Sequence, residues 1–195
     1  MGLIIETGGG LPRMVRISPP AELPVSLPLA KANMRVDGDN MDTLITTWIK
    51  GIVAALEHEI GQCLIEQTWR VTVDSLPAAL GLPHPVMSVT SVKYFDVDGT
   101  EQTLDSADYR LYKARYRSDL MPPRGGAWPA TMVGRDVTVE VVCGYGAAPA
   151  DVPENVQLYL LAKLVEQFDP ATRMERDTVQ SAFVDRLLDA CRSYA

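Results

Sequence analysis

The clearest pattern in the chain is an apolar stripe with helical spacing between residues 39 and 61. Apolar side chains recur there three and four positions apart: Leu44, Ile45, Trp48, Ile49, Ile52, Val53, Leu56 and Ile60. This spacing predicts an amphipathic helix with one buried face. Asp39 or Asn40 can cap its start, and Gly61 can end it because glycine adopts positive φ without strain.

Three further helices are predicted from similar spacing. A short one begins at Ser26, a suitable N-cap, and continues to about Val36. Another runs from Asp151, also a plausible cap, to Phe168, where Asp169 and Pro170 end it. The last covers about 177–193. Each has apolar residues along one side only, so each needs a partner surface.

Between residues 67 and 146 the apolar positions alternate, as they do in half-buried β-strands. The runs are "QTWRVTVDSL", "VMSVTSVKYFDV", "TEQTL", "DYRLYK" and "DVTVEVVCGYG". Prolines and glycines lie between these runs. The pattern therefore predicts an α+β fold, in which the N- and C-terminal helices form a helical core and residues 67–146 form a β-rich insertion. Residues 1–25 contain a glycine triplet and several prolines, which predicts an irregular arm before a single domain at 26–195.

Composition narrows the classes of function. The chain has 195 residues, 47% of them apolar, and a formal charge of −7, so the molecule as a whole is not expected to bind nucleic acid by neutralising phosphates. Three widely spaced cysteines fit neither a disulfide framework nor a zinc cluster. The sequence contains no apolar run long enough for a membrane span and no secretory signal, which predicts a location inside a cell or in an assembly built there.

One stretch, "KYFDVDGTEQTL" at residues 93–104, contains an Asp-x-Asp-Gly run that resembles half of a calcium loop. A calcium loop of the EF-hand type needs its glycine at position six and helices on both sides. Here the glycine is at position four and the flanks resemble strands. We therefore predict a two-residue hairpin turn at Asp98 and Gly99 and no metal.

No frame of catalytic residues is evident. His58-Glu59 begins like a zinc-protease motif, but the second histidine is missing because position 62 is Gln62. His84, the other histidine, lies between two prolines. The sequence predicts no enzyme, no cofactor and no metal, although a small hydrolase with an unrecognised carboxylate site stays as a remote alternative.

A basic and aromatic segment at residues 109–124, "YRLYKARYRSDLMPPR", stands out in this acidic chain. Its candidate contact residues are Arg110, Lys113, Arg115 and Arg117. Alternating tyrosine and arginine resembles a surface that binds nucleic acid by backbone contacts and stacking. The other interpretation is an amphipathic strand and loop whose cations meet acidic groups in the same chain or across a subunit boundary.

The succession of several blocks resembles a known family. They are "RISPPAELPVSLPLAKANMRVDGDNMDTLITTWIKGIVAALEHEIGQCLIEQTWRVTVD", "VMSVTSVKYFDVDGTEQTLDSADYRL", "GGAWPATMVGRDVTVEVVCGYG" and "DVPENVQLYLLAKLVEQF". Together they resemble the tailed-phage head–tail connector proteins of the gp6-like class, in the branch typified by a hypothetical protein of a Burkholderia phage. The resemblance covers roughly residues 15–168.

This resemblance implies a structural protein of the virion. It implies a ring of about a dozen copies that docks under the portal protein, meets a downstream connector or tail-completion protein and extends the DNA channel without reading sequence. It also implies assembly in the bacterial host cytoplasm and a final place at the head–tail junction. Candidate contacts with the portal or with other subunits are Phe183, Arg186 and Leu187 in the last predicted helix and Tyr194 directly after it. The alternative function is a nucleic-acid-binding module at residues 109–124.

Overall fold

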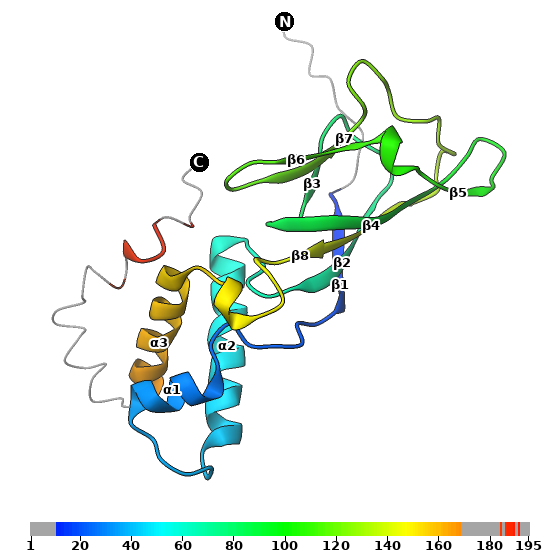
Figure 1. The fold of residues 1–195 in the computed structure, drawn as a ribbon. Helices are drawn as coiled ribbons and strands as arrows, with labels where there is room; N and C mark the ends of the chain where they lie inside the picture. Colours follow the sequence, from blue (N-terminus) through cyan, green and yellow to red (C-terminus); the bar gives the residue numbers. More distant parts are fainter. Residues whose placement is uncertain (1–10, 169–183, 185, 190, 192–195) are drawn as a thin grey trace, which may run out of the picture. The chain divides into compact units, whose positions relative to one another are not determined.

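The computed structural model describes residues 11–168, 184, 186–189 and 191 (Figure 1). The chain forms two compact units. One unit contains the residues up to Pro19 together with Gln67–Cys143, and the other contains Pro20–Glu66 and the chain from Gly144 onward. The chain therefore passes from one unit to the other three times, and each unit is assembled from segments far apart in sequence.

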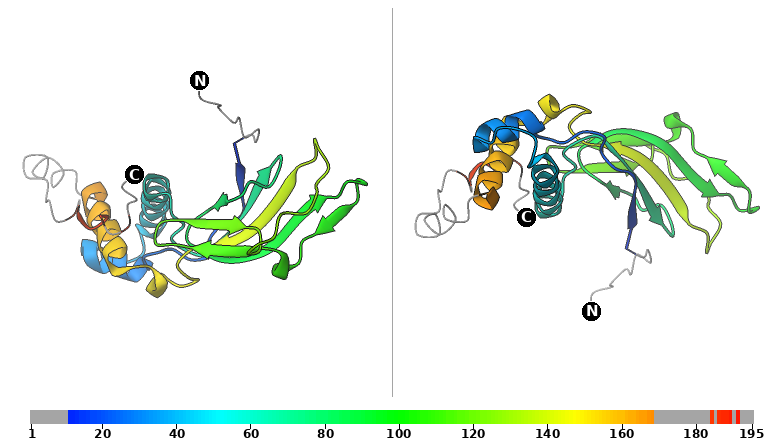
Figure 2. Two further views of the ribbon diagram at one scale, coloured as in Figure 1. Left: turned by 90° about the horizontal axis from the view of Figure 1, so that it is seen from above. Right: turned by 90° about the horizontal axis from the view of Figure 1, so that it is seen from below.

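The first unit is built from two antiparallel sheets. The five-stranded sheet has the order β1-β2-β8-β4-β5, with bounds Arg13–Ser18, Gln67–Val73, Val137–Cys143, Val86–Phe95 and Glu101–Thr103. The three-stranded sheet has the order β3-β7-β6, with bounds Leu80–Leu82, Ser118–Met121 and Arg110–Lys113. A single turn of 3-10 helix, η1 (Ser106–Asp108), precedes β6. Figure 2 shows blue β1 at one edge of the larger sheet and green β5 beyond β4 at the other.

The alternation of side chains explains how these strands pack. In β8, Val137, Val139, Val141 and Cys143 are fully buried, while the residues between them are partly exposed. Val139 faces Val71 of β2 on one side and Val92 of β4 on the other. These residues share a hydrophobic cluster with Leu80, Leu82 and Leu120 of the smaller sheet. The two sheets thus bury one face each against the other.

The second unit contains three α-helices, α1 (Leu27–Met34), α2 (Asp42–Ile60) and α3 (Glu154–Phe168), and the 3-10 turn η2 (Pro149–Asp151). The Ser26 hydroxyl accepts a hydrogen bond from the Leu29 N–H and caps α1. Gly61 ends α2 with φ of 66°, a conformation that costs glycine little. Both ends agree with the positions predicted from the sequence.

A separate hydrophobic cluster lies among these helices. The α2 stripe contributes Ile45, Ile49, Val53, Leu56 and Ile60, and α3 contributes Val156, Leu160 and Leu164. Trp48 packs edge-on against Phe168, with the ring centroids 6.4 Å apart. The spacing of three and four residues therefore does bury one face of each helix.

The predicted arrangement of a helical core with a β-rich insertion is wrong, although the fold is mixed α+β. Eight strands form two antiparallel sheets, compared with three α-helices among the described residues, and the strands have a hydrophobic cluster of their own. Strands with one apolar face need an apolar layer to cover it, and here the second sheet supplies that layer. The sheets are therefore a structural unit in their own right.

The N-terminal segment also differs from its prediction as irregular chain. Arg13–Ser18 forms β1, which pairs antiparallel with β2 from Arg13↔Thr72 to Ser18↔Thr68, with a bulge near Ile17. The segment is held as a strand by backbone hydrogen bonds to β2, some fifty residues away, and not by any pattern in the proline-containing sequence around it.

Most of the predicted last helix, 177–193, lies outside the described residues. Val184 and Arg186 are helical, and the residues from Leu187 to Asp189 form a turn. Across the part of the chain that the structure describes, no helix has the length and apolar character needed to cross a bilayer.

Candidate functional site

The basic segment singled out in the sequence forms the β6–β7 hairpin of the smaller sheet (Figure 1). Its strands pair from Arg110↔Met121 to Lys113↔Ser118. The Ala114 N–H donates to the Arg117 carbonyl at 2.8 Å and closes the turn. All four candidate cations, Arg110, Lys113, Arg115 and Arg117, are therefore on one hairpin and largely exposed.

Two of these cations are bonded to backbone carbonyls of the same unit. Arg110 Nε donates to the Pro122 carbonyl at 3.0 Å. Lys113 Nζ donates to the Met87 carbonyl of β4 at 2.9 Å. These bonds satisfy donors and tie the hairpin to the larger sheet, but they leave the positive charges uncompensated.

The other two cations sit at the turn. Nε of Arg117 lies 2.7 Å from Oδ1 and 2.6 Å from Oδ2 of Asp119, and Asp119 is only 3% exposed. Arg117 therefore compensates a buried carboxylate, which would be costly to leave unpaired. The Arg115 guanidinium lies 5.1 Å from the ring centroid of Tyr116, within the range of a cation–π interaction.

His84 joins the hairpin turn to the strand that follows it. Its Nε2 lies 3.1 Å from the Arg115 carbonyl, and its Nδ1 lies 2.9 Å from the Ser118 hydroxyl. A carbonyl can only accept, so Nε2 carries the hydrogen and Nδ1 accepts from Ser118. Burial lowers the pKa of His84 below its ordinary value. Neutral His84 thus holds the turn that presents Arg115.

Some of the N–H donors on the hairpin cations are therefore already bonded within the chain and are not available to an anion. Arg117 is engaged by Asp119, and Arg110 and Lys113 have part of their donor capacity occupied. Arg115 has no ion pair among the residues that the structure describes. Of the four cations, Arg117 alone meets an acidic group among the described residues, and both interpretations of the segment stay predictions.

The predicted turn residues Asp98 and Gly99 lie in the β4–β5 hairpin. The turn between Asp96 and Thr100 contains three residues where two were predicted. Asp96 N–H donates to the Thr100 carbonyl and Gly99 N–H donates to the Asp96 carbonyl, both at 3.0 Å. Gly99 has φ of 81° and Asp98 does not have positive φ. Gly99 is therefore the left-handed residue of this turn.

The carboxylate of Asp96 stabilises this turn. Oδ1 accepts the N–H groups of Asp98 and Thr100, and Oδ2 accepts the side-chain amide of Gln102. The Gln102 hydrogen bond is the main reason that the pKa of Asp96 is lowered, with Thr100 next. The carboxylate oxygens of Asp96 therefore accept hydrogen bonds from the turn itself. Among the described residues, no three His, Cys, Asp or Glu side chains form a group suited to a metal ion.

The candidates in the last predicted helix are only partly covered. Phe183 and Tyr194 lie outside the described residues, whereas Arg186 is exposed and Leu187 is half-buried. The Leu187 carbonyl accepts a hydrogen bond from Asn155 of α3 at 2.6 Å. The role of these four residues as contacts stays a prediction.

A buried polar network holds the chain near residue 191 against its unit. The Gln62 side chain donates to the Cys191 carbonyl at 2.7 Å and accepts from the Tyr145 hydroxyl. Burial raises the pKa of Tyr145 to about 12. These bonds link the residue that follows the end of α2, the chain after β8 and the C-terminal region within one unit, and no pattern in the sequence predicts them.

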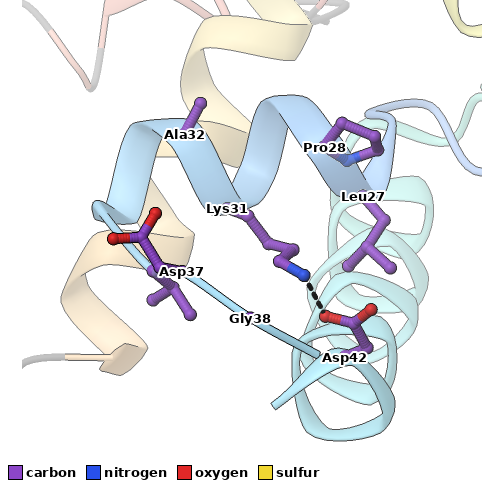
Figure 3. Close-up of a pocket in the computed structure, with 8 residues that line it drawn as sticks. Leu27, Pro28, Lys31, Ala32, Asp37, Gly38 and Asp42 are labelled. Carbon is purple, nitrogen blue, oxygen red and sulfur yellow. Dashed lines mark hydrogen bonds and ion pairs between the residues drawn. The ribbon is translucent and has the colours of Figure 1, made fainter. Parts of the chain in front are cut away.

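A groove of ≈ 400 Å³ lies beside α1 and the α1–α2 connection (Figure 3). Its lining residues are Leu27, Pro28, Lys31, Ala32, Val36, Asp37, Gly38 and Asp42. Lys31 and Asp42 form an ion pair in it, so its one cation is already compensated. The groove has a mixed, largely aliphatic lining with no cluster suited to catalysis.

The main surface that sequence reasoning missed is β1. All six residues of the strand are exposed, although Met14, Val15 and Ile17 are large and apolar. The signal available in the sequence was the β-branched run "RMVRI" between two prolines. Its apolar residues lie on the sheet edge, where the outer backbone groups pair with no strand of the described chain.

Solved structures match this architecture over nearly the whole chain. A chain in the neck of an empty GTA particle computed with C6 symmetry has a TM-score of 0.76 and 16% identity, covering 94% of this chain and 96% of that chain. The two chains share one fold.

Two related structures support the same likeness. A chain in the virion of the native gene transfer agent (GTA) particle has a TM-score of 0.74 and 17% identity, over 93% of this chain and 96% of that chain. A chain in the neck of the native GTA particle computed with C12 symmetry has a TM-score of 0.70 and 19% identity, over 94% and 96%. No protein-family model and no curated protein matches the chain, so the gp6-like class stays a prediction.

Proposed function

We propose that this chain is a structural subunit of the neck of a phage-like particle, at the junction between head and tail. The observation that carries the proposal is the likeness to two neck chains of gene transfer agent particles, over 94% of this chain and 96% of each of those chains, with TM-scores of 0.76 and 0.70. A chain of the virion of such a particle matches to a similar extent. A match of this extent includes both units, so it concerns the whole architecture rather than one common motif.

We further propose that copies of the chain form a ring. The neck structures were computed with C6 and C12 symmetry, and cyclic symmetry is generated by head-to-tail contacts that close after a fixed number of subunits. A ring of about a dozen copies would fit beneath a portal protein, extend its DNA channel and meet a downstream connector or tail-completion protein. In this role the chain is structural and not catalytic, and it assembles in the host cytoplasm.

The net charge of −7 is consistent with a channel wall that does not hold DNA. Like-sign repulsion between an acidic wall and phosphates disfavours adhesion. Among the hairpin cations, Arg117 is already paired with Asp119. We propose that DNA passes without sequence-specific contacts.

The test is the mass of the purified chain over a concentration series, by light scattering coupled to size exclusion, with and without its cognate portal. A closed oligomer of about a dozen subunits, or a monomer that joins the portal ring, is the expected result. A monomer at every concentration that ignores the portal would contradict the proposal.

A further inference from the structure

The larger sheet has two edges with opposite chemical character. One edge is β1, whose flanking stretch, residues 11–19, contains two arginines, Arg13 and Arg16, and no acid. Arg13 is already paired with Asp136 of the same chain at 2.7 Å, whereas Arg16 donates to the uncharged side chain of Gln67 at 3.4 Å, so Arg16 carries the charge that this edge offers to a neighbour. The other is β5, within residues 96–108, which contain five carboxylates and no cation: Asp96, Asp98, Glu101, Asp105 and Asp108. Lys93 compensates Glu101 at 3.3 Å, so an excess of negative charge remains at that edge.

The β1 edge also exposes apolar surface. Val15 is 62% exposed, and Met14 and Ile17 are nearly half exposed. Edge strands of monomeric proteins are usually protected by lysine, proline or inward charges, because their free N–H and C=O groups invite another strand. β1 has a bulge near Ile17 but otherwise a run of six residues without proline. Such an edge is suited to accept a further strand.

The two edges are also compatible in direction. Each neighbouring pair in the order β1-β2-β8-β4-β5 is antiparallel. Four antiparallel steps bring β5 back to the direction of β1. If the sheet of one copy continues into that of the next, β1 and β5 therefore meet as parallel neighbours. A contact between two different edges is head-to-tail, which is the kind that a ring requires.

We propose that β1 of one copy pairs with β5 of the next copy, so that the five-stranded sheets continue across the subunit boundary. This inference rests on the proposed ring and assigns its contact to particular strands. Arg16 would approach the acidic stretch of the neighbour, and Val15 and Ile17 would lose their exposure to water.

Pairing of β1 with a second β1 is the obvious competitor, and charge disfavours it. Such a contact would bring the Arg16 side chains of both copies toward one another, and like charges placed across an interface are destabilising. It would also be a two-fold contact, which ends at a dimer and does not propagate around a ring.

The first test reverses charge on each edge. Arg16→Glu and Glu101→Arg are each expected to raise the protein concentration needed for half assembly about tenfold, because each places like charges across the contact. The two substitutions combined in one chain restore attraction and should recover much of the loss. Lys50→Glu, an exposed cation of α2, is the matched control and should change assembly less than either single variant.

The second test uses engineered cysteines on the two edges. A chain with both Val15→Cys and Thr103→Cys should give, on mild oxidation, a ladder of covalent oligomers that ends at the ring. Neither single variant should do so, because the native Cys63, Cys143 and Cys191 are buried. A covalent dimer from Val15→Cys alone would show the β1–β1 contact and overturn the proposal.

The outcomes separate this inference from the proposed function. If the unmodified chain forms rings but both charge reversals assemble normally and the double-cysteine chain gives no ladder, the edge contact is wrong and the ring stands. If the unmodified chain forms no ring with or without its portal, both proposals fail together. Circular dichroism of every variant should match the unmodified chain, which excludes misfolding as the cause.

Discussion

At the scale of single residues, His84 has the clearest dependence on pH. Neutral imidazole bridges Ser118 and the Arg115 carbonyl, and burial lowers its pKa below the ordinary value of 6.5. The unfolded chain takes up a proton near 6.5, so below that pH the unfolded state binds more protons than the folded state. The stabilisation is complete above pH 6.5 and is lost as pH falls through the folded pKa.

We therefore expect the free energy of unfolding to decrease on acidification below pH 6.5, and His84→Gln to reduce this slope. The measurement is urea unfolding at a series of pH values between about 5 and 8, a range chosen to bracket histidine titration. His58→Gln, the same substitution in α2, is the control for the effect of replacing a histidine as such. An unchanged slope in His84→Gln would contradict the assignment.

Two glycines allow the same substitution to be compared in opposite settings. Gly99 has φ of 81° in the β4–β5 turn, whereas Gly51 lies inside α2 with open space where a Cβ would be. Gly99→Ala should destabilise by about 1 kcal/mol, because alanine is strained at positive φ. Gly51→Ala should stabilise by about 0.5–1 kcal/mol through helix propensity. Thermal unfolding measures both, and equal signs would refute the explanation.

At the scale of elements, local patterns predicted the helices better than they predicted the sheets. The apolar stripe that contains Ile49 predicted α2. The residue types of Ser26 and Gly61 predicted the start of α1 and the end of α2. β1 was missed because Arg13–Ser18 is short, lies between prolines and gains its order from β2, far along the chain. The His84–Ser118 and Arg117–Asp119 contacts were equally invisible, since residue types alone do not set which side chains meet.

The buried stripe of α2 predicts a graded response to truncation. Ile49 is 1% exposed within the cluster shared with α1 and α3, so Ile49→Ala should destabilise by about 3 kcal/mol through lost burial and a residual cavity. Leu44, on the exposed side of the same helix, is the matched control, and Leu44→Ala should cost below about 1 kcal/mol. Chemical denaturation checks this, and similar losses for both would refute the stripe.

At the scale of the whole molecule, DNA affinity distinguishes the two proposed functions, a neck subunit and a nucleic-acid-binding module. A binding module centred on residues 109–124 would show DNA affinity that falls steeply with salt and drops when Arg115 and Arg117 become alanine. We expect weak affinity for free duplex DNA in about 0.15 M salt, because the chain is acidic and Arg117 is paired with Asp119.

Fluorescence anisotropy with a labelled duplex measures this prediction. Arg115→Ala removes a charge and keeps the buried Asp119 paired with Arg117, so any change in DNA affinity reports on Arg115 itself. Arg117→Ala would in addition leave the buried carboxylate of Asp119 without its cation. Tight binding by the unmodified chain that is lost in Arg115→Ala would favour the nucleic-acid module.

The sheet order has a consequence for how the chain acquires its structure during synthesis. β8 lies between β2 and β4 but is the last strand of its sheet to leave the ribosome. Until Val137–Cys143 emerges, β2 and β4 each lack the neighbouring strand with which they form most of their pairs. The sheet therefore cannot form strand by strand in the order of synthesis. A nascent chain stalled before residue 137 would expose two apolar strands with free edges, which makes this interval the one in which a molecular chaperone would matter most.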